Sequence, residues 1–475
     1  DESGNYPYNP MKTVQNSYDQ TRTRQLNLNT YLTWDIIKNL TFKATFNYTW
    51  RQDVRRTFYN SDTYQGDPKY SASGVNGNFS DKDRNSWSNE YTLNYKRRFG
   101  DHNLAGLLGA SLSSDRTTVM GAGSGLITWE SLGFWGLDSG TPRSITTTSV
   151  ESKLMSYFAR FNYDWKSRYI LIATIRADGS SRFPYNKWGY FPSASFAWRL
   201  SDEPFMNLED TFVSNLKLRV GWGATGNQNV QDWAYIALLA TKPTPWGNGV
   251  LNGNTANPNL KWETTYSTNL GLDINLFDNR IEFIADFYYK KTKDMLLQIS
   301  LPAFMGSSGQ GAASNPWGNI GSLENKGIEL TLNTVNIDTK GFQWRSNFVF
   351  SLNRNKILEM DTETGSLPYN LRIGDDDMTV TNSMAGHPIG QFWGYKVIGR
   401  FNEPSDFYYK DANGALKEVP RPEGMKIAEG EAWLGDYIFA NLNGDDVIDN
   451  NDQTIIGNPE PKFTYGIGNT FSWKG

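Results

Sequence analysis

The residues best suited to chemistry lie in the segment ANLNGDDVIDNNDQTIIGN, residues 440–458, where oxygen-bearing side chains recur at short intervals. Their spacing nearly matches that of a calcium-binding loop, in which the seventh residue supplies its backbone carbonyl. Hard oxygen ligands of this kind suit Ca²⁺, the one cofactor that the sequence suggests. The predicted ligands, in order along the loop, are Asn441, Asn443, Asp445, Val447, Asp449 and Asp452.

The predicted calcium loop departs from the usual pattern at three positions. Asn441 brings an oxygen without a charge, Asp446 stands where a sharp turn favours glycine, and Asp452 is shorter than the usual bidentate glutamate. We therefore expect weak binding, in the range of roughly 10⁻⁴–10⁻³ M known for extracellular modules. The alternative is a polar turn whose Asn and Asp side chains cap their own backbone. Either structure would stiffen a surface loop rather than catalyse a reaction.

Other motifs give little support for an enzyme. RADGSSRFP contains Arg176, Asp178, Ser180, Ser181 and Arg182, but no histidine lies nearby and no nucleophile elbow is present, so we interpret it as paired charges at a strand end. The chain has no cysteine and two histidines, which excludes thiol catalysis and zinc–thiolate sites. Its net charge of −4 provides no basic field for nucleic acid. The sequence predicts a protein that is not an enzyme.

Side chains that contact a substrate or a partner are predicted among the tryptophans of the connections. Flat indole rings stack on sugars and pack against proteins, although membrane anchoring and loop packing remain alternatives. Polar residues within the strands, among them Glu282, Asp286, Arg345 and Asn347, line a lumen or hold another segment inside it. The tryptophans in question are Trp129, Trp135, Trp233, Trp246, Trp317 and Trp393.

The elements that position these residues are predicted to be strands with one apolar and one mostly polar face. In RIEFIADFYYK, residues 280–290, Ile281, Phe283, Ala285 and Phe287 alternate with mostly polar residues, a period of two. Hydrophobic content is 38% and aromatic content is 14%, which suits sheets with one apolar face better than a large soluble core. Aromatic residues gather at strand ends, as interfacial girdles do.

Short and long connections alternate along the chain, which is typical of a transmembrane β-barrel with short periplasmic turns and long extracellular loops. The expected long connections cover about residues 52–85, 224–260, 301–321 and 355–461. A spanning strand needs about 9–11 residues, and the alternating runs supply that length. Strands are predicted near residues 23–36, 40–51, 86–98, 103–117, 150–164, 169–179, 187–199, 214–224, 261–275, 280–296, 322–336 and 342–355, with one more beginning at Lys462.

Several segments together resemble the SusC/RagA family of TonB-linked outer-membrane transporters of Bacteroidetes. They occur in the order of that family and cover nearly the whole chain. The segments are RADGSSRFPYNKWGYFPSASFAWRLSDEPFM (176–206), LKLRVGWGATGNQ (216–228), NPNLKWETTYSTNLGLD (257–273), YYKKTKDML (288–296), NIGSLENKGIEL (319–330), GHPIGQFWGYKVIGRF (386–401) and the segment LNGDDVIDNNDQTIIGNPEPKFTYG that begins at Leu442.

The resemblance implies a portion, residues 1–475, of a 22-stranded plugged barrel in a Gram-negative outer membrane, with residues 355–461 as a long extracellular loop segment. It implies active import of bulky nutrients, either glycan oligosaccharides or oligopeptides. The implied partners are a SusD-like surface lipoprotein that acts as a lid, and TonB with ExbB and ExbD. A dimer of transporter–lipoprotein pairs is also implied. No plug domain and no TonB box are recognised, so we expect the chain to be barrel sequence from a longer protein.

Three other functions remain open at this stage. The first is a structural or secretion-related outer-membrane barrel that pumps no substrate. The second is a soluble, calcium-stabilised β protein that binds glycans. The third is a glycan hydrolase, which would need two carboxylates at a catalytic separation. Sequence alone does not show which carboxylates meet in space.

Overall fold

The computed structural model describes residues 10–206, 211–299, 314–362, 365–373, 376–422, 433–445 and 447–474. It divides into two compact units, which we describe separately. Unit 1 comprises Asp1–Ala194, Gly226–Trp262 and Gln310–Ser314, and unit 2 comprises Ser195–Thr225, Glu263–Gly309 and Asn315–Gly475. In the described part of the chain, no helix combines the length and the hydropathy needed to cross a membrane.

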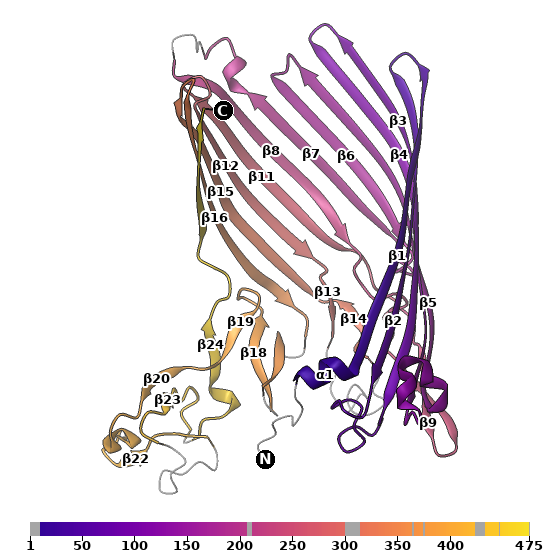
Figure 1. The fold of residues 1–475 in the computed structure, drawn as a ribbon. Helices are drawn as coiled ribbons and strands as arrows, with labels where there is room; N and C mark the ends of the chain where they lie inside the picture. Colours follow the sequence, from indigo (N-terminus) through magenta and orange to yellow (C-terminus); the bar gives the residue numbers. More distant parts are fainter. Residues whose placement is uncertain are drawn as a thin grey trace. The chain divides into compact units, whose positions relative to one another are not determined.

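Unit 1 is built on long antiparallel strands, each paired with the next along the chain (Figure 1). A seven-residue helix, α1 (Pro10–Asn16), precedes them, and a 3₁₀ segment, η1 (Glu130–Ser139), joins the fourth strand to the fifth. A small hairpin of β9 (Leu239–Thr244) and β10 (Gly247–Asn252) also belongs to this unit. The long strands are β1 (Ser17–Ile37), β2 (Leu40–Tyr59), β3 (Asn76–Phe99), β4 (His102–Gly125), β5 (Thr141–Trp165) and β6 (Tyr169–Ser180).

Unit 2 continues the same pattern with β11 (Glu263–Leu276), β12 (Ile281–Lys293), β15 (Gly321–Asp338), β16 (Phe342–Met360) and β25 (Thr464–Trp473). Two strands, β7 (Trp188–Arg199) and β8 (Val213–Asn227), contribute residues to both units. The hydrogen-bonded order of the 13-stranded sheet is β1-β2-β3-β4-β5-β6-β7-β8-β11-β12-β15-β16-β25.

Smaller elements occupy the long connections of unit 2. A four-stranded sheet has the order β17-β18-β19-β24, and three two-stranded pairs join β13 to β14, β20 to β23 and β21 to β22. Their bounds are β13 (Leu296–Gln298), β14 (Trp317–Asn319), β17 (Ser366–Ile373), β18 (Asp376–Met384), β19 (Gln391–Tyr395), β20 (Val397–Arg400), β21 (Tyr408–Lys410), β22 (Leu416–Glu418), β23 (Tyr437–Phe439) and β24 (Gln453–Gly457). The 3₁₀ segments are η2 (Leu200–Asp202), η4 (Pro404–Phe407) and η5 (Asn450–Asp452).

The strand register separates apolar from polar residues row by row in unit 1. One row crosses six strands and is almost wholly apolar, while the next row carries mostly polar or small residues. Successive side chains of a strand point to opposite faces, so these two rows belong to opposite faces of the sheet. The apolar row is Trp34, Phe42, Leu93, Leu108, Ala159 and Ile175, and its neighbour is Thr33, Lys43, Thr92, Gly109, Phe158 and Arg176.

The same division holds in unit 2, where Leu272, Ala285, Leu330, Phe350 and Tyr465 form one row. On the opposite face the adjacent row is Gly271, Asp286, Glu329, Ser351 and Thr464. Many large apolar side chains on the first face are exposed, which is the pattern of a lipid-facing sheet rather than of a buried core. The predicted two-faced strands are therefore confirmed.

All thirteen predicted strands are present, but the prediction placed several of their ends wrongly. The expected connection at 52–85 is shorter, because residues up to Tyr59 belong to β2 and residues from Asn76 belong to β3. These extensions carry polar residues on both faces, with a few apolar ones such as Phe58, and are joined by side-chain contacts such as Gln52 Nε2 to Asp81 at 3.0 Å. Strand residues that do not face lipid need no apolar face, so hydrophobic alternation does not mark them.

Short turns and longer connections mostly alternate along the chain, as predicted, although residues 200–212 between β7 and β8 make a longer connection where regular alternation would place a short turn. Within unit 1 the turns between β1 and β2, β3 and β4, and β5 and β6 have two or three residues. The expected connection at 355–461 is partly wrong at its start, since β16 runs to Met360, and it contains the small sheets described above. Its extracellular position stays a prediction.

Candidate functional site

The polar face of unit 2 carries a charged network centred on Arg219 of β8. The Arg219 guanidinium bonds Asp273 of β11 at 2.7 Å and lies 3.1 Å from Asp286 of β12. Lys217 lies 3.9 Å from Asp273. Gly271 makes room for this arrangement, because a Cβ there would stand 2.4 Å from Arg219 Cζ. One arginine thus neutralises two carboxylates on adjacent strands.

Other predicted inward-facing residues meet around a second polar site of the same face. Glu282, Arg345 and Asn347 line a cavity of about 370 Å³. Asn333 links Glu282 to Asn347, since its amide donates to Glu282 at 2.8 Å and accepts from Asn347 at 2.7 Å. The sequence identified these residues as polar and inward-facing, and the register explains why they lie together.

The polar face of unit 1 contains a cavity of about 320 Å³ that is rich in hydroxyl groups. Its wall is fixed by Asp115, which accepts from Arg84 and from the Ser86 hydroxyl, both at 2.6 Å. Apart from Trp87 and Leu154, the lining is polar: Asn47, Thr49, Ser86, Ser88, Ser113, Ser114, Asp115, Ser152, Lys153 and Gln228. Both units thus present hydrogen-bonding groups on one face and apolar groups on the other.

The RADGSSRFP motif lies where β6 ends and ties strands to a long connection. Arg176 Nε lies 2.8 Å from Asp178, and Arg176 Nη2 donates to the fully buried Ser156 hydroxyl at 2.9 Å. Arg182 pairs with Asp232 of the following connection at 2.9 Å. These contacts confirm the interpretation of paired charges at a strand end.

The aromatic residues around this motif form a small core in unit 1. Phe183 and Leu260 are fully buried, and the Trp262 ring lies 5.5 Å from the Phe183 ring and 5.4 Å from the Phe191 ring. Trp262 Nε1 also donates to the Lys187 carbonyl at 2.9 Å. This core holds the short connection at 181–187 against the end of the long one at 228–262, so the two connections share one anchor.

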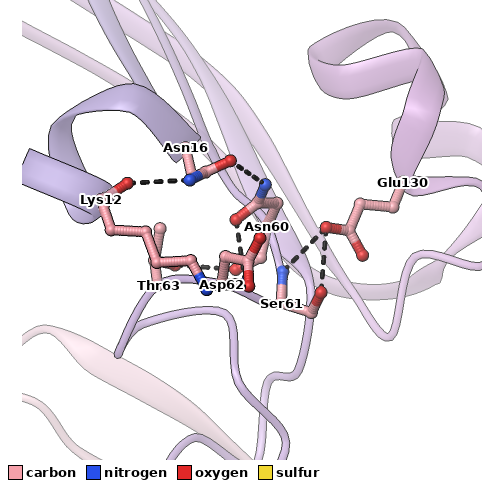
Figure 2. Close-up of polar contacts among 7 residues, drawn as sticks. All are labelled: Lys12, Asn16, Asn60, Ser61, Asp62, Thr63 and Glu130. Atoms are coloured by element: carbon pink, nitrogen blue, oxygen red, sulfur yellow. Dashed lines mark hydrogen bonds and ion pairs between the residues drawn. The ribbon is translucent and has the colours of Figure 1, made fainter. Parts of the chain in front are cut away.

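Another anchor fastens α1 to the connection that follows β2 (Figure 2). The Asn60 amide donates to Asn16 Oδ1 at 2.9 Å, and Lys12 Nζ lies 2.6 Å from Asp62. None of the residues of α1 is buried. Polar contacts, rather than a hydrophobic face, therefore hold this helix.

The same connection orients the segment that carries two of the predicted tryptophans. Both the backbone N–H and the hydroxyl of Ser61 donate to Glu130 at 3.0 Å (Figure 2). The Arg56 guanidinium lies 5.3 Å from the Trp135 ring, and Trp129 and Trp135 remain 63% and 75% exposed. Indole rings that are exposed but held in place are suited to contact another molecule.

The remaining predicted tryptophans are placed differently. Trp246, between β9 and β10, is 94% exposed, and Trp233 is 44% exposed. Trp317 is half-buried in β14, and Trp393 in β19 donates from Nε1 to Gln453 at 2.8 Å. The predicted set does not belong to one unit, since Trp129, Trp135, Trp233 and Trp246 lie in unit 1 and the other two in unit 2.

The predicted calcium loop forms a series of turns capped by its own side chains. Asn441 Oδ1 accepts from the Gly444 N–H at 2.7 Å, and Asp445 Oδ1 accepts from the Val447 N–H at 2.9 Å. Asp445 also accepts from the Asn443 side chain at 2.6 Å. Asp446, the sixth residue of the predicted loop, lies outside the described residues.

Asp452 is the centre of this loop and is fully buried. Its two oxygens accept the backbone N–H of Leu442 at 2.6 Å and that of Asp449 at 3.0 Å. The Asp449 N–H donor above all holds the pKa of Asp452 below its usual value, against the opposing effect of burial.

The described side chains of the predicted loop make hydrogen bonds within the loop. The described part of the chain contains no group of three histidine, cysteine, aspartate or glutamate side chains that could hold a metal ion. The contacts of Asp452 and its neighbours instead match the backbone-capping alternative. Calcium binding stays a prediction, and we derive no functional step from it.

Comparison with known proteins identifies the family. A family model described as "TonB dependent receptor-like, beta-barrel" matches residues 1–450. TonB-dependent receptor P3 of Formosa agariphila is 32% identical over 98% of this chain and 45% of its own length. TonB-dependent receptor SusC of Bacteroides thetaiotaomicron is 31% identical over 70% of this chain and 31% of its own length. The chain spans less than half the length of these curated relatives.

A solved structure described as the RagAB peptide transporter shares the fold, with a TM-score of 0.75 and 22% sequence identity. The match covers 97% of this chain and 47% of that one. The predicted all-β, antiparallel barrel class is thereby confirmed, as is the resemblance to the SusC/RagA transporters. Proteins of this family are receptors and transporters of the Gram-negative outer membrane. With the family model matching almost from end to end, this chain belongs to the TonB-dependent receptor-like β-barrel family.

Proposed function

We propose that this chain forms barrel wall in an active importer of bulky nutrients, either oligosaccharides or oligopeptides. The observation that carries the proposal is the division of each unit into an apolar and a polar face. An apolar face suits lipid, and a polar face with cavities and charged networks suits a water-filled or plugged lumen. The description of one structural relative as a peptide transporter adds support for this class of cargo.

In this proposal the long connections lie outside the cell and cooperate with a SusD-like lipoprotein lid. The shared anchors around Trp262 and Glu130 would keep those connections in position while cargo is captured. TonB, with ExbB and ExbD, would supply energy through parts of the protein beyond these residues. The source would be a bacterium of the Bacteroidetes, and two transporter–lipoprotein pairs would assemble together.

Uptake in cells tests the proposal directly. Fluorescent oligopeptides and oligosaccharides are offered to cells that contain the full receptor, to cells that lack it, and to cells that lack TonB. We expect accumulation of one cargo class to need both the receptor and TonB. Accumulation that needs the receptor but persists without TonB would favour a passive barrel, and accumulation that needs neither would refute the proposal.

We further propose that Trp129 and Trp135 contact the lid or the cargo. Replacing both by alanine removes two exposed rings while leaving the hydrophobic cluster that packs against Phe134 and Leu137, which includes Phe58 and Ile127, in place. We expect less lipoprotein to copurify with the receptor, or cargo to bind more weakly. Trp165, at the short-turn end of β5, is the matched control. Equal losses in the Trp165→Ala variant would mean that the effect is general.

A further inference from the structure

A small cavity in the long connection of unit 2 lies beside the β20–β23 pair. Its volume is about 280 Å³, and most of its wall consists of aromatic and proline side chains. The Phe401 and Phe407 rings, 4.5 Å apart, form the hydrophobic cluster next to it. The residues that line the cavity are Phe401, Pro420, Arg421, Pro422, Gly435, Asp436, Tyr437, Ile438 and Phe439.

Among the described residues of this wall, Arg421 carries buried side-chain nitrogens that lack a hydrogen-bond partner. Its side chain is 12% exposed, and Nη2 bonds the carboxylate of Glu418, which is half exposed. The Nε and Nη1 atoms are buried and have no hydrogen-bond acceptor among the described residues. A buried donor without an acceptor carries the cost of its lost hydration, and that cost is greater for a charged group.

The backbone holds Arg421 firmly at this position. Pro420 and Pro422 flank it, and each proline fixes its own φ and restricts the residue before it. The Arg421 carbonyl accepts the Ile448 N–H at 2.9 Å, and Arg421 forms an isolated bridge with Val447. The turn centred on Asp452 therefore positions the arginine, which gives that turn a role without a metal.

The guanidinium of Arg421 has a carboxylate partner in Glu418, but its Nε and Nη1 atoms remain without an acceptor among the described residues. The Glu418 carboxylate accepts from Arg421 Nη2. Asp436, on the cavity wall, accepts the Trp433 N–H at 2.8 Å through one of its oxygens. Arg400, which donates to the Tyr437 hydroxyl at 2.9 Å, adds a second positive charge beside the wall. Arg421 lines the cavity, and a rotation of its side chain would turn the Nε and Nη1 donors into that space. An anion with oxygen acceptors that enters the cavity would then bind them.

We propose that this cavity binds a carboxylate group carried on a compact apolar or planar body. The carboxylate accepts from the free N–H groups of Arg421, since bonds between charged partners are the strongest that a guanidinium makes. The aromatic and proline walls cover the rest of the group. A peptide C-terminus and a uronic acid both present this chemistry. The proposal does not rest on import, because binding is measured without transport.

Calorimetric titration of the detergent-purified, full-length receptor tests the proposal. The probes are the peptide Gly-Gly-Phe as free acid and as amide, and trigalacturonic acid and its methyl ester. We expect one of the acids to bind and its uncharged counterpart to bind roughly tenfold or more weakly. Which acid binds distinguishes the two sources. Failure of both acids to bind at millimolar concentration, or equal binding of acid and uncharged form, would overturn the proposal.

Variants assign the binding to Arg421. Arg421→Gln is expected to weaken acid binding about tenfold, whereas Lys410→Gln, which removes a positive charge from exposed β21, leaves it unchanged. Glu418→Gln frees the third guanidinium nitrogen from a competing anion, so we expect tighter binding. A misfolded loop would not give tighter binding. Unchanged affinity in Arg421→Gln, or weaker binding in Glu418→Gln, would contradict the assignment.

Discussion

Arg219 is the residue on which the polar face of unit 2 depends most. Without its guanidinium, Asp286 would lose the cation that it pairs with, and Asp273 would be left with Lys217, 3.9 Å away. We expect Arg219→Gln to lower the free energy of unfolding by about 1–3 kcal/mol, the cost of leaving partly buried charged groups unpaired. Urea unfolding in detergent, followed by tryptophan fluorescence, measures this change.

Two further variants separate the loss of this network from a general loss of charge. Arg345→Gln removes a positive charge from the same face, where Arg345 lines the neighbouring cavity. Arg345→Gln should lower the free energy of unfolding much less than Arg219→Gln does. Removing both carboxylates with Asp273→Asn and Asp286→Asn in the Arg219→Gln background should recover most of the stability. No recovery would mean that packing, rather than charge, explains the role of Arg219.

Asp452 gives the acidic turn a defined pH dependence. Because its pKa is lower in the folded turn than in an unfolded chain, its stabilising contribution is present above the unfolded value, about 3.9, and is lost as pH falls through the folded value. We expect proteolysis at residues 441–452 to accelerate below about pH 4. Asp452→Asn should show fast cleavage already at neutral pH, and Asp445→Asn, whose carboxylate is exposed, should change little. Equal resistance of Asp452→Asn and the parent at pH 7 would contradict this account.

Calcium can be tested on the same cleavage assay. If the loop binds Ca²⁺ with the weak affinity that its sequence predicts, millimolar Ca²⁺ slows cleavage of the parent and a chelator reverses the effect. If the side chains only cap the backbone, cleavage does not respond to either. The sequence could not decide between these alternatives, because the same Asn and Asp oxygens serve both.

At the scale of the strand, Gly109 of β4 shows how tightly the polar face is packed. A Cβ at this position would stand 2.2 Å from the Phe158 ring on β5, and Arg176 lies 5.4 Å from the centre of the same ring. We expect Gly109→Ala to lower the free energy of unfolding by about 1–3 kcal/mol through overpacking. Thermal unfolding in detergent measures the loss.

Gly106, three residues earlier in β4, is the matched control. A Cβ there would meet no atom within 4 Å. Alanine at Gly106 should be neutral or slightly stabilising, since glycine costs backbone entropy in a strand. If both variants lose the same stability, the contact with Phe158 does not explain the effect.

The elements were predictable from sequence where one face meets an apolar environment, and less so elsewhere. In β12, the apolar residues Ile281, Phe283 and Ala285 alternate with other residues, and this alternation alone predicts the strand. The end of β2 between Gln52 and Tyr59 could not be predicted in this way. Polar pairs such as Arg55 with Asp19 stabilise it, so apolar residues do not alternate regularly there. Site residues such as Arg219 and Arg421 were missed because their roles depend on the register and on contacts distant in sequence.

At the scale of the molecule, the family and the two faces of the sheet together indicate which face of the strands meets the membrane. The apolar face of these strands meets lipid, and the polar face is turned away from it. The chain lacks cysteine, so single cysteines can be introduced within it, and the labelling of the unmodified receptor gives the background.

The most direct test places one bimane-labelled cysteine at each of residues 328–333 of β15 in the full receptor, reconstituted with lipids that carry a quencher. The account predicts strong quenching at Ile328, Leu330 and Leu332 and weak quenching at Glu329, Thr331 and Asn333, because these residues alternate between the two faces. Equal quenching at all six positions, or alternation with the opposite phase, would contradict the assignment of the lipid-facing wall.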